Sequence, residues 1–256
     1  YMLEGYDEDW RHVGNRRTAY YTNTSPGTYT FRVTDANGCN IATPTVTITD
    51  PPQVTATAAI TSNYNGSEVS CMGATDGEIT VTAGGGTGLL TYTLVEQPGN
   101  TTGASSGVFT GVPAGTYPVN VVDVNGCPVV TAPVTIDNPP SVTGTAAITS
   151  DYNGADVSCM GASDGVITVT ASGGTGALSY ILNQNPANVT GAATGVFTDL
   201  SAGVYTITIT DANGCFITTP GVVVNNPPAI TASASVTSNY NGSQVSCNGA
   251  SDGEIT

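Results

Sequence analysis

Short stretches of alternating apolar and polar residues recur along most of the chain. In residues 29–34, Tyr, Phe and Val alternate with Thr and Arg, and in residues 205–210 Tyr and Ile alternate with Thr. A period of two places one set of side chains on one face of a strand. No stretch has the 3.6-residue period of an amphipathic helix, so the sequence predicts an all-β protein.

An Asn-Gly pair followed by a cysteine comes directly after these alternating stretches. The sequence reads DANGC at residues 35–39, DVNGC at 123–127 and DANGC at 211–215, a step of 88 residues each time. Asn-Gly tolerates the positive φ angles of a tight turn, and between two strand patterns it is typical of a β-hairpin. A hairpin with a cysteine just past its turn is therefore predicted to recur at a fixed period.

Other features return with the same step: the turn at 63–66 (NYNG), the Val-Ser-Cys triplet at 69–71 and the Pro-Pro pair at 51–52. A fixed period is the signature of a repeat protein, and we interpret the Pro-Pro pairs as linkers within a longer array of domains. The predicted parts are a partial β-sandwich at 1–52, complete repeats at 53–139 and 140–228, and the start of a further repeat at 229–256.

Each complete repeat is expected to be an immunoglobulin-like β-sandwich of about seven short strands, in an extended array. Tyr29, Tyr117 and Tyr205 follow Pro-Gly or Ala-Gly corners, and we interpret them as tyrosine corners whose hydroxyl groups bond to the corner backbone rather than as ligand-stacking residues. Pro133 and Pro220 predict that the last strand lies at a sheet edge or carries a bulge, because proline cannot donate a ladder hydrogen bond.

The charge of the chain is strongly one-sided. There are 19 acidic residues against four arginines and no lysine, which gives a net charge of −15. Such a surface repels phosphate backbones and anionic membranes, so nucleic-acid binding is excluded. No apolar run approaches the roughly 20 residues that span a bilayer, so no membrane insertion is expected here.

Six cysteines at repeating positions predict disulfides and an extracellular location. Pairing within repeats would join Cys71 to Cys127 and Cys159 to Cys215, leaving Cys39 and Cys247 to partners beyond this sequence. In a standard sandwich these positions lie some 30 Å apart at opposite poles, whereas a disulfide needs Cα atoms within about 7 Å. The other pairing joins Cys71 to Cys215 between repeats; we favour the pairing within repeats because an autonomous repeat is the simpler building block.

Catalysis and metal binding have little support in the residues present. His12 is the only histidine, and Asp76 with Glu78 has no partner motif, so the chain is not expected to be an enzyme. No zinc motif occurs and no cofactor is expected. Calcium could bind where aspartates converge at domain junctions, although no calcium-loop motif is present and solvated carboxylates are the simpler reading. The aspartates concerned are Asp50, Asp76, Asp123, Asp137, Asp164 and Asp211.

The start of the chain resembles a known family. YMLEGYD at residues 1–7, Trp10, AYYTN at 19–23 and PGTYTFRV at 26–33 resemble the triple-tyrosine domain that precedes the membrane in many hybrid two-component sensors. The resemblance covers about the first 33 residues and implies a β-sandwich half joined to the repeats.

The repeats resemble a second family. The VSCMGA-(T/S)-DG motif, the glycine-rich break, the Ala-Gly-(Thr/Val)-Tyr corner and the DANGC hairpin, over roughly residues 34–256, resemble SprB repeats. These are repeats of very large surface adhesins of gliding Bacteroidetes, exported by the type IX secretion route. The resemblance implies a fibre on the surface of a Gram-negative bacterium.

The leading hypothesis is therefore a structural stalk or filament segment of a secreted adhesin, which spaces a binding end from the cell and bears tension. Its expected partners are neighbouring repeats, with lateral self-association and a surface or glycan ligand left open. The alternative is a carbohydrate-binding or sensing ectodomain, which the triple-tyrosine resemblance and the aromatic residues near the start of the chain suggest. Those residues are Tyr6, Trp10, Tyr20 and Tyr21.

Overall fold

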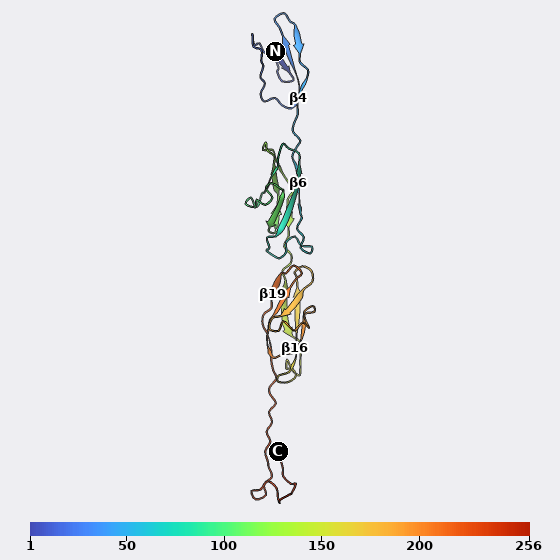
Figure 1. Cartoon of the computed structure of the whole chain (residues 1–256), viewed down its shortest axis with the longest axis vertical. Helices are drawn as coiled ribbons and strands as arrows, with labels where there is room; N and C mark the ends of the chain where they lie inside the picture. The colour runs from blue at the N-terminus through green and yellow to red at the C-terminus, as the bar shows by residue number, and fades with distance from the viewer. The chain divides into compact units, whose positions relative to one another are not determined.

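The computed structural model describes residues 1–256, and every regular element in it is a β-strand (Figure 1). The all-β prediction is confirmed, and no helix is present that is long and apolar enough to cross a membrane. The chain divides into a first compact unit, residues 1–61 and 77–136, and a second compact unit, residues 62–76 and 137–256. The finer division into four parts stays a prediction.

The N-terminal sheet of the first compact unit is organised around one long strand. β2 (Gly27–Thr34) pairs antiparallel with β1 (Met2–Glu4), β3 (Asn40–Ala42) and β4 (Val46–Ile48). The DANGC sequence forms the turn between β2 and β3, where Thr34 lies opposite Asn40. The predicted hairpin is therefore present at this position.

The rest of the first unit holds three antiparallel sheets with the orders β5-β6-β8, β11-β10-β7 and β12-β9. The strands are β5 (Thr55–Ile60), β6 (Gly77–Gly84), β7 (Thr91–Leu94), β8 (Val108–Val112), β9 (Gly115–Tyr117), β10 (Val119–Val122), β11 (Pro128–Val130) and β12 (Val134–Ile136). Apolar side chains alternate on β6 as the sequence pattern predicts, because Ile79 and Val81 are both buried.

The second unit has the same strands in the same order, in sheets β13-β14-β16, β15-β18-β19 and β17-β20. The strands are β13 (Thr143–Ile148), β14 (Ser163–Ser172), β15 (Ser179–Leu182), β16 (Val196–Ser201), β17 (Gly203–Tyr205), β18 (Ile207–Thr210), β19 (Phe216–Thr218) and β20 (Val222–Val224). The register of β14 against β16 shifts near Gly165, as in a β-bulge.

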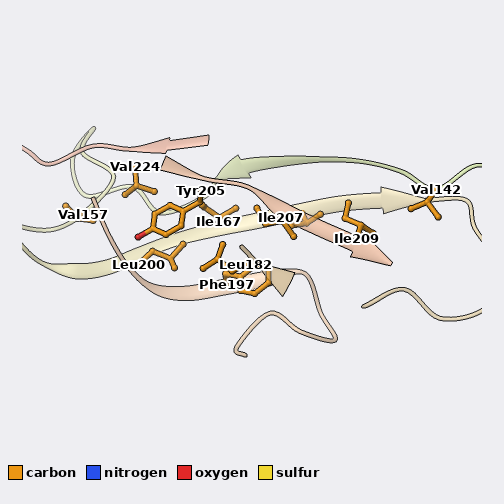
Figure 2. Close-up of a cluster of buried hydrophobic side chains, with 11 residues drawn as sticks. Val142, Val157, Ile167, Leu182, Phe197, Leu200, Tyr205, Ile207, Ile209 and Val224 are labelled. Carbon is orange, nitrogen blue, oxygen red and sulfur yellow. The ribbon is translucent and has the colours of Figure 1, made fainter. Parts of the chain in front are cut away.

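The core of the second unit lies between its sheets (Figure 2). Ile167 on β14 and Phe197 on β16 meet Leu182 on β15 and Ile207 on β18, and all four side chains are fully buried. On β18, the threonines that alternate with Ile207 and Ile209 are only partly buried. Two antiparallel sheets around one apolar layer make the immunoglobulin-like sandwich that the pattern predicts.

The final strand predicted in each repeat is divided in two. Pro133 lies between β11 and β12, and Pro220 lies between β19 and β20. β11 pairs only with β10, whereas β12 pairs only with β9, so each piece is an edge strand. The proline stands where the chain passes from one sheet to the other and no ladder hydrogen bond is required of it.

Candidate functional site

The most elaborate polar site of the molecule lies in the second compact unit, where two segments distant in sequence meet. We call residues 62–76 the Cys71 loop and residues 211–215 the Cys215 hairpin. The two are joined by the disulfide Cys71–Cys215, whose Cα atoms are 5.7 Å apart across a sequence separation of 144. The site is built from the local folding of each segment and from the contacts between them.

The Cys215 hairpin is shaped by the carboxylate of its first residue. Oδ1 of Asp211 accepts hydrogen bonds from the main-chain N–H groups of Asn213 and Cys215, both at 2.9 Å. Gly214 supplies a positive φ of 88°, which a side chain would disfavour. The Asp-x-Asn-Gly-Cys order thus fixes a turn that presents both Asn213 and Cys215 on one short segment.

The first aspartate of each hairpin also anchors that hairpin to the glycine-rich break of its repeat. Oδ2 of Asp211 accepts from the N–H of Thr175 at 2.8 Å, and Oδ2 of Asp123 accepts from Thr87 at 2.9 Å. The simpler reading of these carboxylates as solvated is wrong, because both are only 5% exposed. The N–H of Cys127, followed by that of Thr87, holds the pKa of Asp123 below its ordinary value.

The Cys71 loop is closed by its own hydrogen bonds. The N–H groups of Tyr64 and Ser67 each donate to the other residue's carbonyl, at 2.7 and 3.0 Å, while Asn65 adopts a φ of 51°. The Tyr64 hydroxyl donates to the Asp76 carbonyl at 2.9 Å, and the Ser70 N–H donates to Oδ1 of Asp76 at 3.0 Å. These bonds set the direction in which the cysteine points.

Asparagine side chains make the polar contacts between loop and hairpin. Nδ2 of Asn213 donates to the carbonyl oxygens of Tyr64 and Ser70, both at 3.1 Å, and its Oδ1 accepts from Nδ2 of Asn65 at 2.6 Å. Ser67 and Thr175 pair through their hydroxyl groups at 3.1 Å. The hairpin is therefore recognised by hydrogen bonds as well as by the disulfide.

Residues 137–140, which belong to the predicted linker, bind the Cys71 loop and the glycine-rich break. Oδ1 of Asn138 accepts from the Gly73 N–H at 2.9 Å, and the Asp137 N–H donates to Oε2 of Glu68 at 2.6 Å. The Pro140 carbonyl accepts from the Gly174 N–H at 2.9 Å. Loop, linker and glycine-rich break thus form one hydrogen-bonded assembly within the second unit.

The favoured pairing of cysteines within repeats is wrong. Cys71 pairs with Cys215, so neither Cys71–Cys127 nor Cys159–Cys215 is formed, and the remaining cysteines are free and exposed. In the second unit Cys159 precedes β14, whereas the Cys215 hairpin meets Thr175 beyond the other end of that strand. Ten residues of strand span about 33 Å, far more than a disulfide can bridge. The free cysteines are Cys39, Cys127, Cys159 and Cys247.

Four of the six aspartates considered for calcium accept hydrogen bonds from main-chain N–H groups, and a fifth, Asp137, is exposed. Asp76 and Asp164 accept from the N–H groups of Ser70 and Ser158, both at 3.0 Å, and Asp123 and Asp211 anchor the hairpins. Asp50 is exposed. No group of three or more His, Cys, Asp or Glu side chains could hold a metal ion.

Each of the three corner tyrosines donates its hydroxyl proton to the carbonyl four residues earlier. Tyr29 binds Ser25 at 2.6 Å, Tyr117 binds Pro113 at 3.0 Å and Tyr205 binds Ser201 at 2.9 Å. All three rings are buried. The hydroxyl groups therefore bond to the backbone of the preceding corner.

The structure also reveals residues that the sequence reading missed. Thr131 and Thr219 are buried, and their hydroxyl oxygens accept from the N–H groups of Val119 and Ile207 at 3.0 and 3.1 Å. These threonines complete the ladder where the chain changes sheets. Their recurrence in the two repeats, with Thr43 in the same role toward Phe31, is a signal that could have identified them.

A separate hollow of about 870 Å³ lies in the first unit. Trp10, Arg16 and Arg17 line it, together with Tyr1 and Phe31. The other aromatic residues proposed for ligand binding lie outside its lining. Tyr20 is exposed, and Tyr21 packs edge-on against Tyr6 and donates its hydroxyl proton to Asp7.

Comparison with family models confirms both resemblances. Residues 1–47 match the Y_Y_Y domain, and residues 63–95 and 152–187 match the SprB repeat. The first match extends past Val33, where the resemblance was expected to end, and includes the first DANGC hairpin. The SprB repeat indicates an adhesin-like domain of the cell surface or extracellular space. Neither family is an enzyme family.

No curated protein matches the chain, whereas several solved structures are distantly similar. A C-terminal fragment of intimin, solved with the intimin-binding domain of its translocated receptor, is 16% identical with a TM-score of 0.29; 85% of this chain is covered, and it spans 61% of that fragment. Extracellular domains 3–5 of Drosophila OTK are 14% identical with a TM-score of 0.31, covering 79% of this chain and 72% of that one. The Bacteroides ovatus protein SGBP-B, solved with a mixed-linkage heptasaccharide, is 16% identical with a TM-score of 0.20. The match covers 84% of this chain and 57% of that one.

Proposed function

We propose that the chain is a load-bearing stalk segment of a secreted adhesin on the surface of a Gram-negative bacterium, where it spaces a binding end from the cell. The match to the SprB repeat supports the surface location, and the expected route is type IX secretion in a gliding cell. The single observation that carries the load-bearing role is the Cys71–Cys215 disulfide.

The disulfide alters the path that tension takes along the chain. When the two ends are pulled, force reaches Cys71 and passes through the sulfur atoms to Cys215, so the intervening backbone carries no load. Strands β6 to β18 lie inside this closed segment. A stalk built in this way transmits force while most of its sandwich strands are shielded from it.

Single-molecule force spectroscopy on the whole chain, held at its two ends, tests this role. Because an extended residue spans about 3.3–3.6 Å, the closed segment should shorten the fully stretched chain by about 500 Å, and a reducing agent should restore that length. The double variant Cys127→Ser/Cys159→Ser is the matched control, since it removes free cysteines and leaves the disulfide in place. Equal stretched lengths with and without reducing agent would overturn the proposal.

The hollow around Trp10 favours a second candidate function, carbohydrate binding. Trp10 is 40% exposed and lines, with Arg16 and Arg17, a cavity of about 870 Å³, a size that suits a small ligand. Glycan-array binding that is lost in Trp10→Ala but kept in Tyr20→Ala would support it, because Tyr20 is exposed outside the hollow. Absence of binding by the unaltered chain would exclude it for the glycans tested.

A further inference from the structure

A second loop in the second compact unit has the same sequence pattern and the same internal bonds as the Cys71 loop. We call residues 150–164 the Cys159 loop. Tyr152 and Ala155 exchange main-chain hydrogen bonds at 2.8 and 3.2 Å, and the Tyr152 hydroxyl donates to the Asp164 carbonyl at 3.0 Å. The Ser158 N–H donates to Oδ1 of Asp164 at 3.0 Å. Each bond has a counterpart in the Cys71 loop at nearly the same distance.

The chain that follows also binds the Cys159 loop in the same way. Oδ1 of Asn226 accepts from the Gly161 N–H at 3.0 Å, as Asn138 does from Gly73. The Asn225 N–H donates to Oδ2 of Asp156 at 2.8 Å. Residues 225–226 therefore bind the Cys159 loop in the way that residues 137–138 bind the Cys71 loop.

The groups that bind the hairpin in the Cys71 loop are exposed in the Cys159 loop. Cys159, Tyr152 and Ser158 are exposed, whereas the corresponding Cys71, Tyr64 and Ser70 are partly buried. Asn153 keeps the φ of Asn65, at 54° against 51°. Asn65 and Cys71, whose side chains contact the hairpin, have the same residues at 153 and 159, whereas Ser67, which pairs with Thr175 of the glycine-rich break, is replaced by alanine at 155.

We propose that the Cys159 loop is an acceptor site for a hairpin of the Asp-x-Asn-Gly-Cys type carried by a following repeat, and that Cys159 forms a disulfide with that hairpin. The occupied Cys71 loop shows the ligand that this loop sequence binds. By the same geometry, the carbonyl groups of Tyr152 and Ser158 accept from the hairpin asparagine amide, and Asn153 donates to its oxygen.

The bond requires the oxidation of two thiols. Cys159 and the hairpin cysteine lose two protons and two electrons as the S–S bond forms, and a small-molecule disulfide such as oxidised glutathione accepts them and becomes two thiols. The reaction takes place by thiol–disulfide exchange, so the exposure of Cys159 makes its sulfur accessible to the oxidant.

Such disulfides would extend the proposed load-bearing role from one pair of repeats to many. This mechanical consequence rests on the proposed function, whereas the disulfide itself does not. Cys159 lies between Cys71 and Cys215 in the sequence. A disulfide that starts at Cys159 and ends in a later repeat would therefore begin inside the first closed segment and end outside it. Successive closed segments interlock, and breaking one disulfide leaves much of the chain still enclosed by the next.

The test extends the whole chain at Thr256 with a copy of residues 169–228, which completes another repeat because Thr256 stands where Thr168 stands. In the added copy, tyrosine replaces the residue corresponding to Phe216, so that the added hairpin peptide differs in mass from the original one. After oxidation with glutathione and alkylation of free thiols, an aspartate-specific protease is used, since the chain has no lysine or arginine beyond Arg32. We expect the Cys159 peptide linked to the added hairpin peptide and loss of alkylation at Cys159.

The Cys71–Cys215 peptide in the same digest shows that the protein is folded and oxidised, and it is measured independently of the stretching experiment. A matched chain with serine in place of the added hairpin cysteine should leave Cys159 fully alkylated. If Cys159 stays alkylated in the cysteine-containing chain, or pairs with any other cysteine while Cys71–Cys215 is present, the proposal is wrong and the stalk function is unaffected.

Discussion

At the scale of single residues, buried hydroxyl and carboxylate groups secure the corners of each sandwich. The Tyr117 hydroxyl bonds to the Pro113 carbonyl, and burial of the ring raises the pKa of this tyrosine. The ring of Tyr92, in the same unit, lies beside Gly107, and its hydroxyl makes no hydrogen bond to a preceding corner. The two tyrosines therefore offer a matched comparison of a hydroxyl that is bonded to the backbone with one that is not.

We expect Tyr117→Phe to lower the free energy of unfolding by about 0.5–1.5 kcal/mol, because the Pro113 carbonyl loses its partner inside the fold. Tyr92→Phe should change it by much less. Urea denaturation followed by circular dichroism gives both values. Equal effects of the two substitutions would show that the corner hydrogen bond adds nothing to stability.

Asp123 predicts a dependence of stability on acidic pH. Its pKa in the folded state is lowered by the N–H groups of Cys127 and Thr87, so the ionised form is favoured in the folded protein. Its stabilising contribution is complete above the unfolded pKa of about 3.9 and is lost as the pH falls through the lower, folded pKa. The folded protein should thus lose melting temperature below about pH 4.

The variant Asp123→Asn should melt at a lower temperature at neutral pH, because its amide group would face the Thr87 N–H as a second donor. Its melting temperature should also fall less steeply in acid than that of the unaltered chain. Asp50→Asn, at an exposed position, is the control. An unchanged acid dependence in Asp123→Asn would contradict the role assigned to this carboxylate.

At the scale of elements, the glycine-rich breaks allow backbone to approach backbone. Gly173 has a φ of 78°, and a Cβ there would overlap the Ser141 carbonyl oxygen. Gly161 has a similar φ of 82°, but a Cβ there would meet no atom within 4 Å. The pair separates the cost of an unfavourable φ from the cost of a steric overlap.

Gly161→Ala should lower the free energy of unfolding of the second unit by about 1–2 kcal/mol through φ strain alone. Gly173→Ala should lower it by about 1–3 kcal/mol more, since the start of the repeat must also move away from the break. Chemical denaturation of the two variants measures the difference. Similar losses would mean that the close approach at Ser141 is readily relieved.

Sequence patterns predict elements better than they predict contacts between distant elements. The alternating residues and the Asn-Gly turns locate the strands and hairpins, and the prolines mark edge strands, because these depend on local geometry. The division of the last strand at Pro133 follows from the path of the chain between two sheets, which alternation does not encode. The burial of Asp123 likewise depends on Thr87, distant in sequence.

The cysteine pairing shows the same limit at the candidate site. Identical motifs at a fixed period make several pairings equivalent in sequence, and the separation of the two ends of a strand only argued against the pairing within a repeat. In the structure, Asn65 and Asn213 accompany the Cys71–Cys215 pair, and their side chains meet across a sequence distance of 148 residues. Turn chemistry alone accounts for both asparagines in the sequence, so nothing in the sequence indicates that they also bind each other.

At the scale of the whole molecule, one disulfide within the second compact unit closes a segment of chain that also runs through the first. The Cys71 loop connects β5 to β6 of the first unit, yet it lies within the second unit and is bonded to Cys215 there. The closed segment therefore includes strands of both units. Its opening releases a long loop in the unfolded chain, so the disulfide is expected to stabilise the folded state mainly through entropy.

Cys71→Ser/Cys215→Ser should lower the free energy of unfolding of the second unit by about 3–5 kcal/mol, the range expected for a closed segment of this length. Hydrogen exchange of peptides from β14 and β18 measures this value, and β2, which lies outside the closed segment, serves as the internal reference. Cys127→Ser/Cys159→Ser controls for loss of thiols, because both are free and exposed. If exchange at β14 and β18 is no faster than in this control, the disulfide contributes no stability, and its role is restricted to limiting the stretched length of the chain.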